Sequence, residues 1–330
     1  MAVVGALVQT LNDISKGMAA NSRAQRVIEI LNQQNEMMED ILWMECNDGT
    51  SHKSTIRTGL PFGTWRMMYQ GVQPAKTTRS EVRDTVGVLE QYAEPDKAII
   101  DISTDPAEAR ASEARGIIEG MTQQMQQAML YGNQLVVPQM FTGFTPRFNS
   151  RSAGTGANII DAGGTGADNT SIWYVVWGED TCHGLYPKGI PGGVQTRDLG
   201  EDTVQLTDGS RYQCYREHFR WAAGLTLRDW RYVVRIANID VSDLTTDVAK
   251  LKALVSLMIQ ASEIIRTPGQ GRAAWYMNRN TASKLRVAIL EKVGLNLTWE
   301  TVAGKKVMMF DGVPVRRVEQ LLNTEALVAA

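Results

Sequence analysis

Apolar residues recur at helical spacing between Asp105 and Tyr131, and this is the clearest pattern in the chain. The members of this face are Ala114, Ile117, Ile118, Met121, Met125, Ala128 and Met129. Pro106 suits the first turn of a helix, and Gly132-Asn133 supplies a stop signal. The spacing therefore predicts a helix over 105–131, which at 1.5 Å per residue is roughly 40 Å long.

Residues 50–98 alternate like strands instead. Ser54–Thr58 and Thr64–Tyr69 are short candidate strands, and Ser80–Tyr92 carries valines of one parity that Asp84 interrupts. The pattern predicts a long β-hairpin whose apolar faces are too thin to form a core alone. We expect this hairpin to lie on another part of the chain or on a neighbouring copy.

The N-terminal region predicts an arm followed by a helix. The first twenty residues contain scattered Leu and Val without a sustained period, so they need a neighbour to pack on. Ser22 and Gln25 have the spacing of a capping box, which predicts a helix from Ser22 to about Met44.

The chain after the long helix begins with an irregular stretch and then alternates strand and helix signals. Residues from Pro138 to about Asn169 are rich in Gly, Ser, Thr and Asn. The later elements that the pattern predicts are strands at 171–177, 212–221, 225–239 and 273–277, helices at 246–267 and 280–293, a turn at Ala303-Gly304, and a hairpin of 306–310 with 313–318 around Asp311-Gly312.

Composition indicates an ordinary globular protein. Of 330 residues, 43% are hydrophobic and 21% are charged, and the formal net charge is −2. This balance argues against a disordered chain and against a strongly basic nucleic-acid binder. No apolar run approaches the roughly 18–20 residues of a membrane helix, and the start lacks the basic region of a signal peptide. Three widely spread cysteines indicate a reducing compartment without a disulfide framework.

Two sets of residues invite a ligand hypothesis. Cys182, His183, Cys214 and His218 suggest zinc, but adjacent residues of a strand face apart, so at most three could converge. We favour buried packing for them. The glycine-rich segment 152–169 matches neither phosphate-binding glycine motif, so a turned or flexible loop is favoured.

Catalytic and nucleic-acid hypotheses are weaker still. His218 follows Glu217, but neighbours in a strand cannot orient each other, and no G-x-S-x-G elbow is present. Glu39-Asp40 and Glu179-Asp180 are expected in solvated turns. Aromatic residues interleave with four arginines, for which we favour a salt-bridged face over base stacking; the arginines are Arg220, Arg228, Arg231 and Arg235. The sequence therefore assigns no catalytic, cofactor-binding or metal residue, and no cofactor.

The segments AAWYMNRNTASKLR (273–286), VGLNL and GKKVMMFDGVPVRRVEQLL (304–322) follow one another as a strand, a helix and a hairpin. Their order resembles the later part of the major capsid proteins of tailed phages, which have the Hong Kong 97-type fold. The positions that match are Trp275, Met277, Asn278, Thr281, Leu285, Gly312, Pro314 and Val315.

Four further segments resemble a narrower group, the capsid proteins of short-tailed, epsilon15-like phages. They are RTGLPFGTWRMMYQGVQPAKT (57–77), NIIDAGGTGADNTSIWYVVWG (158–178), HGLYPKG (183–189) and RDWRYVVRIANIDVS (228–242). The resemblance covers residues from about 25 to 325, and it is specific because of the order of the motifs.

The resemblance implies an α+β chain with the parts of that fold. Residues 1–45 would form the N-arm and first helix, and 46–98 the extended E-loop hairpin. Residues 99–135 and 171–239 would form the peripheral domain with its long spine helix, and 240–330 the axial domain. Residues 136–170 remain an irregular glycine-rich loop.

The resemblance also implies a structural role. The chain would self-assemble into pentamers and hexamers of an icosahedral head that encloses double-stranded DNA. It would reside in the virion after assembly in the bacterial cytoplasm, with no membrane partner and weak non-specific proximity to DNA. A cement or decoration protein, a scaffolding protein and a portal are further partners of such shells. The alternatives are an intracellular metal- or nucleotide-dependent enzyme and another virion protein, such as a decoration or adaptor protein.

Overall fold

The computed structural model describes residues 36–329 except 50, 60, 247, 291–296 and 303–304. These residues form two compact units. The smaller unit contains residues 88–125 and 193–222. The larger unit contains 36–87, 126–192 and the described residues from 223 onward. The expected N-terminal arm and the Ala303-Gly304 turn lie outside the described residues.

The larger unit is built on a mixed sheet whose central strand is β5 (Asn169–Trp177). All nine residues of β5 are buried, and it pairs antiparallel with β10 (Arg272–Met277) on one side and with β9 (Val233–Asp240) on the other. The further strands of this sheet are β1 (Trp43–Glu45), β4 (Ile159–Asp161), β6 (Cys182–Tyr186), β11 (Leu297–Val302), β12 (Lys305–Phe310) and β13 (Val313–Arg317).

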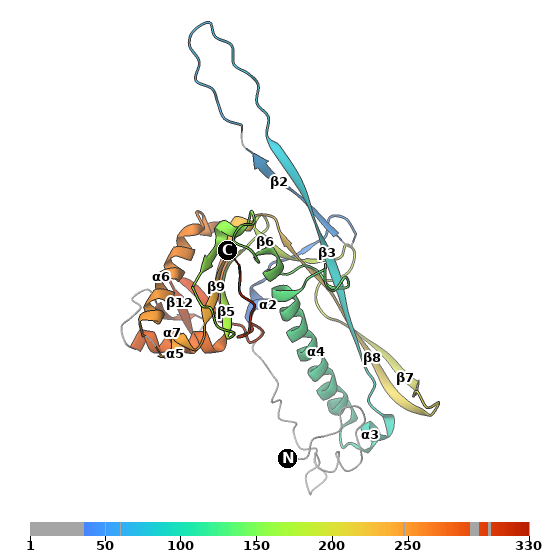
Figure 1. Ribbon diagram of the computed structural model, residues 1–330. Coiled ribbons are helices and arrows are strands. Elements are labelled where there is room, and N and C mark those ends of the chain that lie inside the picture. The colour runs from blue at the N-terminus through green and yellow to red at the C-terminus, as the bar shows by residue number, and fades with distance from the viewer. Residues whose placement is uncertain are drawn as a thin grey trace. The chain divides into compact units, whose positions relative to one another are not determined.

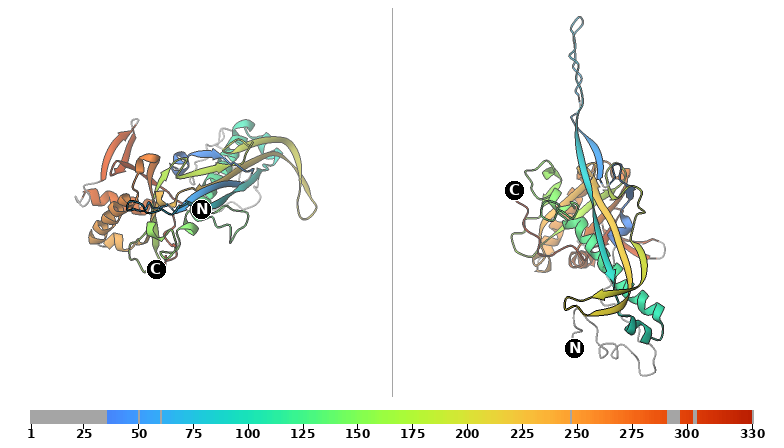
Figure 2. Two further views of the ribbon diagram at one scale, coloured as in Figure 1. Left: turned by 90° about the horizontal axis from the view of Figure 1, so that it is seen from above. Right: turned by 90° about the vertical axis from the view of Figure 1, so that its right-hand side faces the viewer.

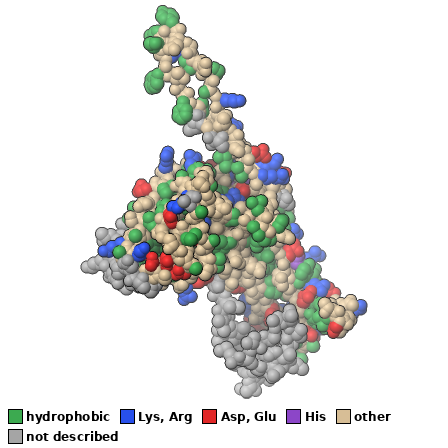
Figure 3. Space-filling model, viewed as in Figure 1, with side chains coloured by type: hydrophobic (Ala, Val, Ile, Leu, Met, Phe, Trp, Pro, Cys, Tyr) green, Lys and Arg blue, Asp and Glu red, His purple; other side chains and the backbone are tan. Residues whose placement is uncertain are grey.

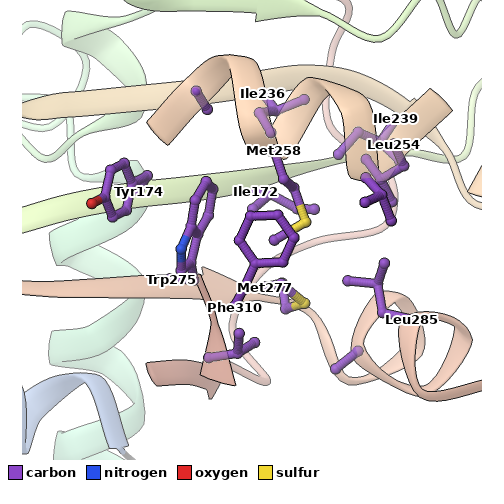
Figure 4. Close-up of a cluster of buried hydrophobic side chains, with 14 of the residues drawn as sticks. Ile172, Tyr174, Ile236, Ile239, Leu254, Met258, Trp275, Met277, Leu285 and Phe310 are labelled. Atoms are coloured by element: carbon purple, nitrogen blue, oxygen red, sulfur yellow. The ribbon is translucent and has the colours of Figure 1, made fainter. Parts of the chain in front are cut away.

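Helices cover one face of this sheet and close a hydrophobic core (Figure 1). They are α5 (Asp243–Thr246), α6 (Val248–Ile264) and α7 (Arg279–Leu290). Trp275 stacks on Tyr174 with 4.3 Å between ring centroids, and Phe310 meets the same indole edge-on at 5.5 Å (Figure 4). Met258 of α6 is fully buried in this cluster. Rings in these geometries add to the stabilisation that burial itself provides.

A buried ion pair lies on the opposite face of β5 and β9. Arg235 pairs with Glu325 at 2.8 Å, with 2% and 4% of the two side chains exposed. The carboxylate also accepts hydrogen bonds from the hydroxyls of Ser171 and Tyr131. Burial and the adjacent carboxylate raise the pKa of Tyr131. The C-terminal segment is thereby tied to the end of the long helix and to the sheet.

A second buried carboxylate holds α2 (Glu36–Asp40) on the same unit. Asp40 is fully buried, and its partners are Arg272 at 2.7 Å, Arg316 at 3.0 Å and the Tyr276 hydroxyl at 3.1 Å. The expectation that Glu39-Asp40 forms a solvated turn is therefore wrong for Asp40, because two arginines neutralise its carboxylate inside the unit.

The smaller unit is dominated by ion pairs. Its hairpin is formed by β7 (Gln195–Gln205) and the first part of β8 (Arg211–Leu227), and α3 (Lys97–Ile102) lies within the same unit. Arg110 of the long helix donates to Asp198 at 2.7 Å and to Glu217 at 2.5 Å, and it lies over the ring of Tyr215. Exposed ion pairs of this kind add little net stability, because holding the two side chains in one geometry costs entropy.

The predicted long helix is confirmed as α4 (Pro106–Tyr131). Its three methionines, Met121, Met125 and Met129, are buried, whereas Ile117 and Ile118 are only half-buried. Gly116 and Gly120 do not break the helix. Among the described residues, no atom lies within 4 Å of the place that a Cβ would occupy at either position.

Other predicted elements differ in detail. Residues 64–69 form no strand. The strand expected over 225–239 is divided by a 3₁₀ turn at Trp230–Tyr232 into the end of β8 and the start of β9. Val234 and Ile236 of β9 pack in the hydrophobic cluster with α6. A strand, β1, occupies part of the segment expected to be helical up to Met44.

Gly116→Ala should stabilise the unassembled subunit by up to about 1 kcal/mol, because alanine has the higher helix propensity and the site is open. The measurement is the thermal unfolding midpoint. Gly143→Ala is the matched control, because its Cβ would lie 2.5 Å from the Met129 carbonyl oxygen and should lower the midpoint. A shift of both variants in the same direction would contradict the helix geometry.

Candidate assembly surfaces

A two-stranded hairpin extends from the larger unit (Figures 1 and 2). β2 (Ser51–Gly59) pairs antiparallel with β3 (Thr78–Ala93), from Ser51 opposite Thr85 to Gly59 opposite Thr78. The connecting residues 61–77 form no regular strand. This confirms the predicted hairpin and moves its tip to residues that we had expected to form a second strand.

The tip of the hairpin displays an apolar surface, visible in Figure 3. Its large side chains are 52–105% exposed, and we call them the tip cluster: Phe62, Trp65, Met67, Met68, Tyr69 and Val72. The turn that carries them is ordered by hydrogen bonds. The Gln70 amide donates to the Met67 carbonyl at 3.2 Å, and the Arg66 guanidinium donates to the Gln70 carbonyl at 3.1 Å.

Tyr69 adopts a backbone conformation that is rare for its residue type. Its φ is +68°, in the left-handed region that favours glycine. The side chain is fully exposed, so no contact with the described residues offsets the conformational cost. Residues in sparsely populated backbone conformations are concentrated at functional sites.

The root of the hairpin is anchored by a buried carboxylate. Asp84 of β3 pairs with Arg147 at 2.8 Å and accepts the hydroxyl hydrogen of Thr226. Arg147 also donates to the carbonyl oxygens of Thr142 and Leu225, each at 3.1 Å. One guanidinium therefore joins the hairpin to β8 and to the loop after α4.

Two histidines meet beside this root. His52 of β2 and His183 of β6 are buried, with ring centroids 5.5 Å apart and the rings perpendicular. Burial, reinforced by the neighbouring ring and Arg228, lowers the pKa of His183 to about 4. The pKa of His52 is lowered by the same burial and by Arg228, while Asp84 opposes the shift. Both rings are therefore neutral at pH 7.

A second apolar surface lies in the loop after α4. We call it the base patch: Leu135, Val136, Val137 and Met140, exposed by 94%, 74%, 39% and 41%. The adjacent Gln134 accepts a hydrogen bond from the Thr85 hydroxyl at 3.0 Å, so the patch flanks β3 at the root end of the hairpin.

The proposed zinc residues are distributed over both units. Cys182 and His183 are fully buried in β6, and burial raises the pKa of the Cys182 thiol. Cys214 and His218 lie on the part of β8 in the smaller unit, where His218 stacks on Tyr92 and faces Glu90. Among the described residues, no three His, Cys, Asp or Glu side chains gather closely enough to hold a metal ion.

The other residues considered from the sequence lie in ion pairs, in a solvated turn or in tightly packed backbone. The four interleaved arginines pair with Glu90, Asp180, Asp229 and Glu325, respectively, so each is salt-bridged as expected, but they do not share one strand face, and the pair of Arg235 is buried. Glu179-Asp180 is a solvated turn, as predicted. The glycine-rich segment contains β4, and Gly164 packs tightly against the backbone of β9. Of the helices in the described ranges, none has the length and hydropathy to span a membrane.

Comparison with known proteins identifies the family. The profile of the major capsid protein GP7 family matches residues 19–329. The chain belongs to this family of major capsid proteins. The near-atomic structure of bacteriophage Epsilon15 contains a chain with 36% sequence identity and a TM-score of 0.76, and the match covers 100% of both chains. Among curated proteins, none matches the sequence significantly.

The fold of this capsid protein recurs at greater distance. The bacteriophage JBD30 capsid chain matches with a TM-score of 0.52 at 9% identity, over 96% of this chain and 99% of that one. The fold is the Hong Kong 97-type capsid fold that the order of the sequence motifs implied. The protein is a structural component of the capsid shell of the virion.

The root residues of the capsid protein's hairpin were not assigned from sequence. Asp84 appeared only as an interruption of an apolar strand face. A buried carboxylate on such a face requires a cation, and Arg147 lies 63 residues away in sequence. The charged residue in an apolar strand face was therefore the signal available in the sequence, but it did not identify Arg147 as its partner.

Asp84→Ala should destabilise the subunit by about 3–5 kcal/mol, because Arg147 would be left buried without its counter-charge. Chemical denaturation of the unassembled subunit measures this. The control is Glu81→Ala on the same strand, whose partner Lys53 is 3.8 Å away and solvent-exposed, and it should be nearly silent. Equal effects of the two variants would mean that the root is not anchored by Asp84.

The stability of the subunit should fall as pH decreases from about 6.5 to 4. Since the folded pKa of His183 is about 4 and an unfolded histidine has a pKa near 6.5, the unfolded state binds more protons in this window. His183→Leu should flatten the dependence of the unfolding midpoint on pH. Cys182→Ala, a buried neighbour that does not titrate there, should keep the original slope; an unchanged slope in His183→Leu would refute the assignment.

Proposed function

We propose that this capsid protein forms the pentamers and hexamers of an icosahedral head that encloses double-stranded DNA. In this role the hairpin is the extended E-loop, which lies across a neighbouring subunit. The observation that carries the proposal is the exposed tip cluster at the end of a hairpin whose root is buried. An apolar surface of this extent in an isolated subunit is typical of an interaction site.

We assign the remaining parts in the same terms. Residues 1–45 form the N-arm and 46–98 the E-loop. Residues 99–135 and 171–239 form the peripheral domain with α4 as spine helix, 136–170 the connecting loop, and 240–330 the axial domain. The hydrophobic cluster joins residues of β5 and β9 to α6, so we infer that the peripheral and axial domains share these two strands.

The proposed role contains no catalytic step. Assembly would take place in the bacterial cytoplasm, where scaffolding, portal and cement or decoration proteins are the further candidate partners. A net charge of −2 supports only weak, non-specific contact with the packaged DNA, because tight phosphate binding needs clustered cations. The shell would then neither bind nor repel the packaged DNA strongly.

Trypsin should cut the unassembled subunit after Arg66 and Lys76, which are both exposed, and these cuts should become at least tenfold slower in assembled shells. Electron microscopy of the same preparation verifies shell formation. Subunits dissociated from those shells serve as the control and should regain the rapid cleavage. Cleavage at equal rates in shells and subunits would contradict the E-loop assignment, and failure of the chain to form shells or rings would contradict the proposed function.

A further inference from the structure

We propose that the tip cluster of one subunit docks on the base patch of a second copy, in a head-to-tail contact. The inference rests on the proposed self-assembly and specifies the receiving surface. It starts from the observation that these two sites are runs of neighbouring exposed apolar side chains, six at the tip and four at the base.

The two surfaces match in chemistry. Residues 61–75 carry a single charge, on Arg66, and residues 132–146 carry none. The cores of protein interfaces are depleted in charged residues, because a charge buried without a partner is costly. Docking of these two segments would bury apolar side chains without desolvating an ion pair.

Both surfaces are ordered before contact. In the base patch, the amides of Val136 and Val137 donate to the Asn133 carbonyl at 3.1 and 2.9 Å, and the Met140 amide donates to the Val137 carbonyl at 3.0 Å. The tip has its own turn between Met67 and Gln70. A preformed surface loses less conformational entropy on binding, so more of the burial contributes to affinity.

The geometry of the hairpin directs the tip toward another molecule. The base patch flanks β3 near Gly87, whose Cβ would lie 3.0 Å from the Gln139 carbonyl oxygen. The tip begins beyond Thr78, which is about 30 Å farther along a paired strand at roughly 3.3 Å per residue. A tip held at that end of the ribbon cannot fold back onto its own base patch.

The available area suits a protein contact. The three aromatic rings of the tip would remove about 450–750 Å² from water if fully buried, compared with roughly 800 Å² per partner in a standard interface. The donor and acceptor surfaces differ, so a head-to-tail contact is heterologous, and its repetition closes rings or propagates. A two-fold dimer would instead pair the two surfaces reciprocally and stop at two copies, and the length of the covalent oligomers distinguishes the two arrangements.

Disulfide trapping tests the contact. The native cysteines Cys46, Cys182 and Cys214 are buried, so the double variant Trp65→Cys with Leu135→Cys reports on the introduced thiols. Oxidised assemblies should show a ladder of covalent oligomers longer than dimers on non-reducing gels. Each single variant should show none, and Trp65→Cys paired with Leu327→Cys, another exposed apolar position, is the matched control.

Several outcomes would overturn the proposal. Dimers from Trp65→Cys alone would mean that two tips meet, and a ladder with Leu327→Cys in place of Leu135→Cys would mean a different receiving surface. Slow maleimide labelling of Leu135→Cys in the unassembled subunit would mean that the chain's own N-terminal segment covers the patch. Normal shells without the expected ladder would refute the docking site alone, whereas the absence of any assembly by the wild-type chain would refute the proposed function.

Discussion

The assembly role that we propose for the hairpin depends on one buried carboxylate, which anchors it. A two-stranded hairpin is at best marginally stable by itself, and this one carries its largest side chains at the end where nothing in the described chain covers them. Asp84 ties the root through Arg147 and Thr226 to β8 and to the loop after α4. Because the root is fixed, the tip is held at a defined distance from the body of its unit.

The same arrangement explains why the base patch lies where it does. Arg147 binds the carbonyl oxygen of Thr142, a few residues beyond Met140. The loop that carries the base patch and the strand that carries the tip therefore share an anchor. A change at this anchor would displace the tip cluster and the base patch together. The distance between these two surfaces is set by the paired strands β2 and β3.

Sequence patterns predicted those parts of the fold whose signals are local. The period of α4, the turn at Asp311-Gly312 and the order of capsid motifs each reside in a short segment, and the structure and comparisons confirm them. Two of the failed predictions show what a local pattern lacks. Asp40 is buried because Arg272 and Arg316, distant in sequence, meet it, and residues 64–69 form no strand because no described strand pairs with them. The contact between the two histidines carried no prediction, because they come from strands more than 120 residues apart. The tip cluster was visible in sequence only as a family resemblance, since exposure is a property of the folded chain.

The ion pair between Arg235 and Glu325 has a consequence for the order of events during synthesis. Its partners are 90 residues apart, and Ser171 precedes Glu325 by 154 residues. While the ribosome is still adding those residues, the guanidinium of Arg235 has no counter-charge, and a buried unpaired charge is strongly unfavourable. This face of β5 and β9 therefore cannot close on the nascent chain until residue 325 has emerged, so the larger unit cannot reach its final structure before that point.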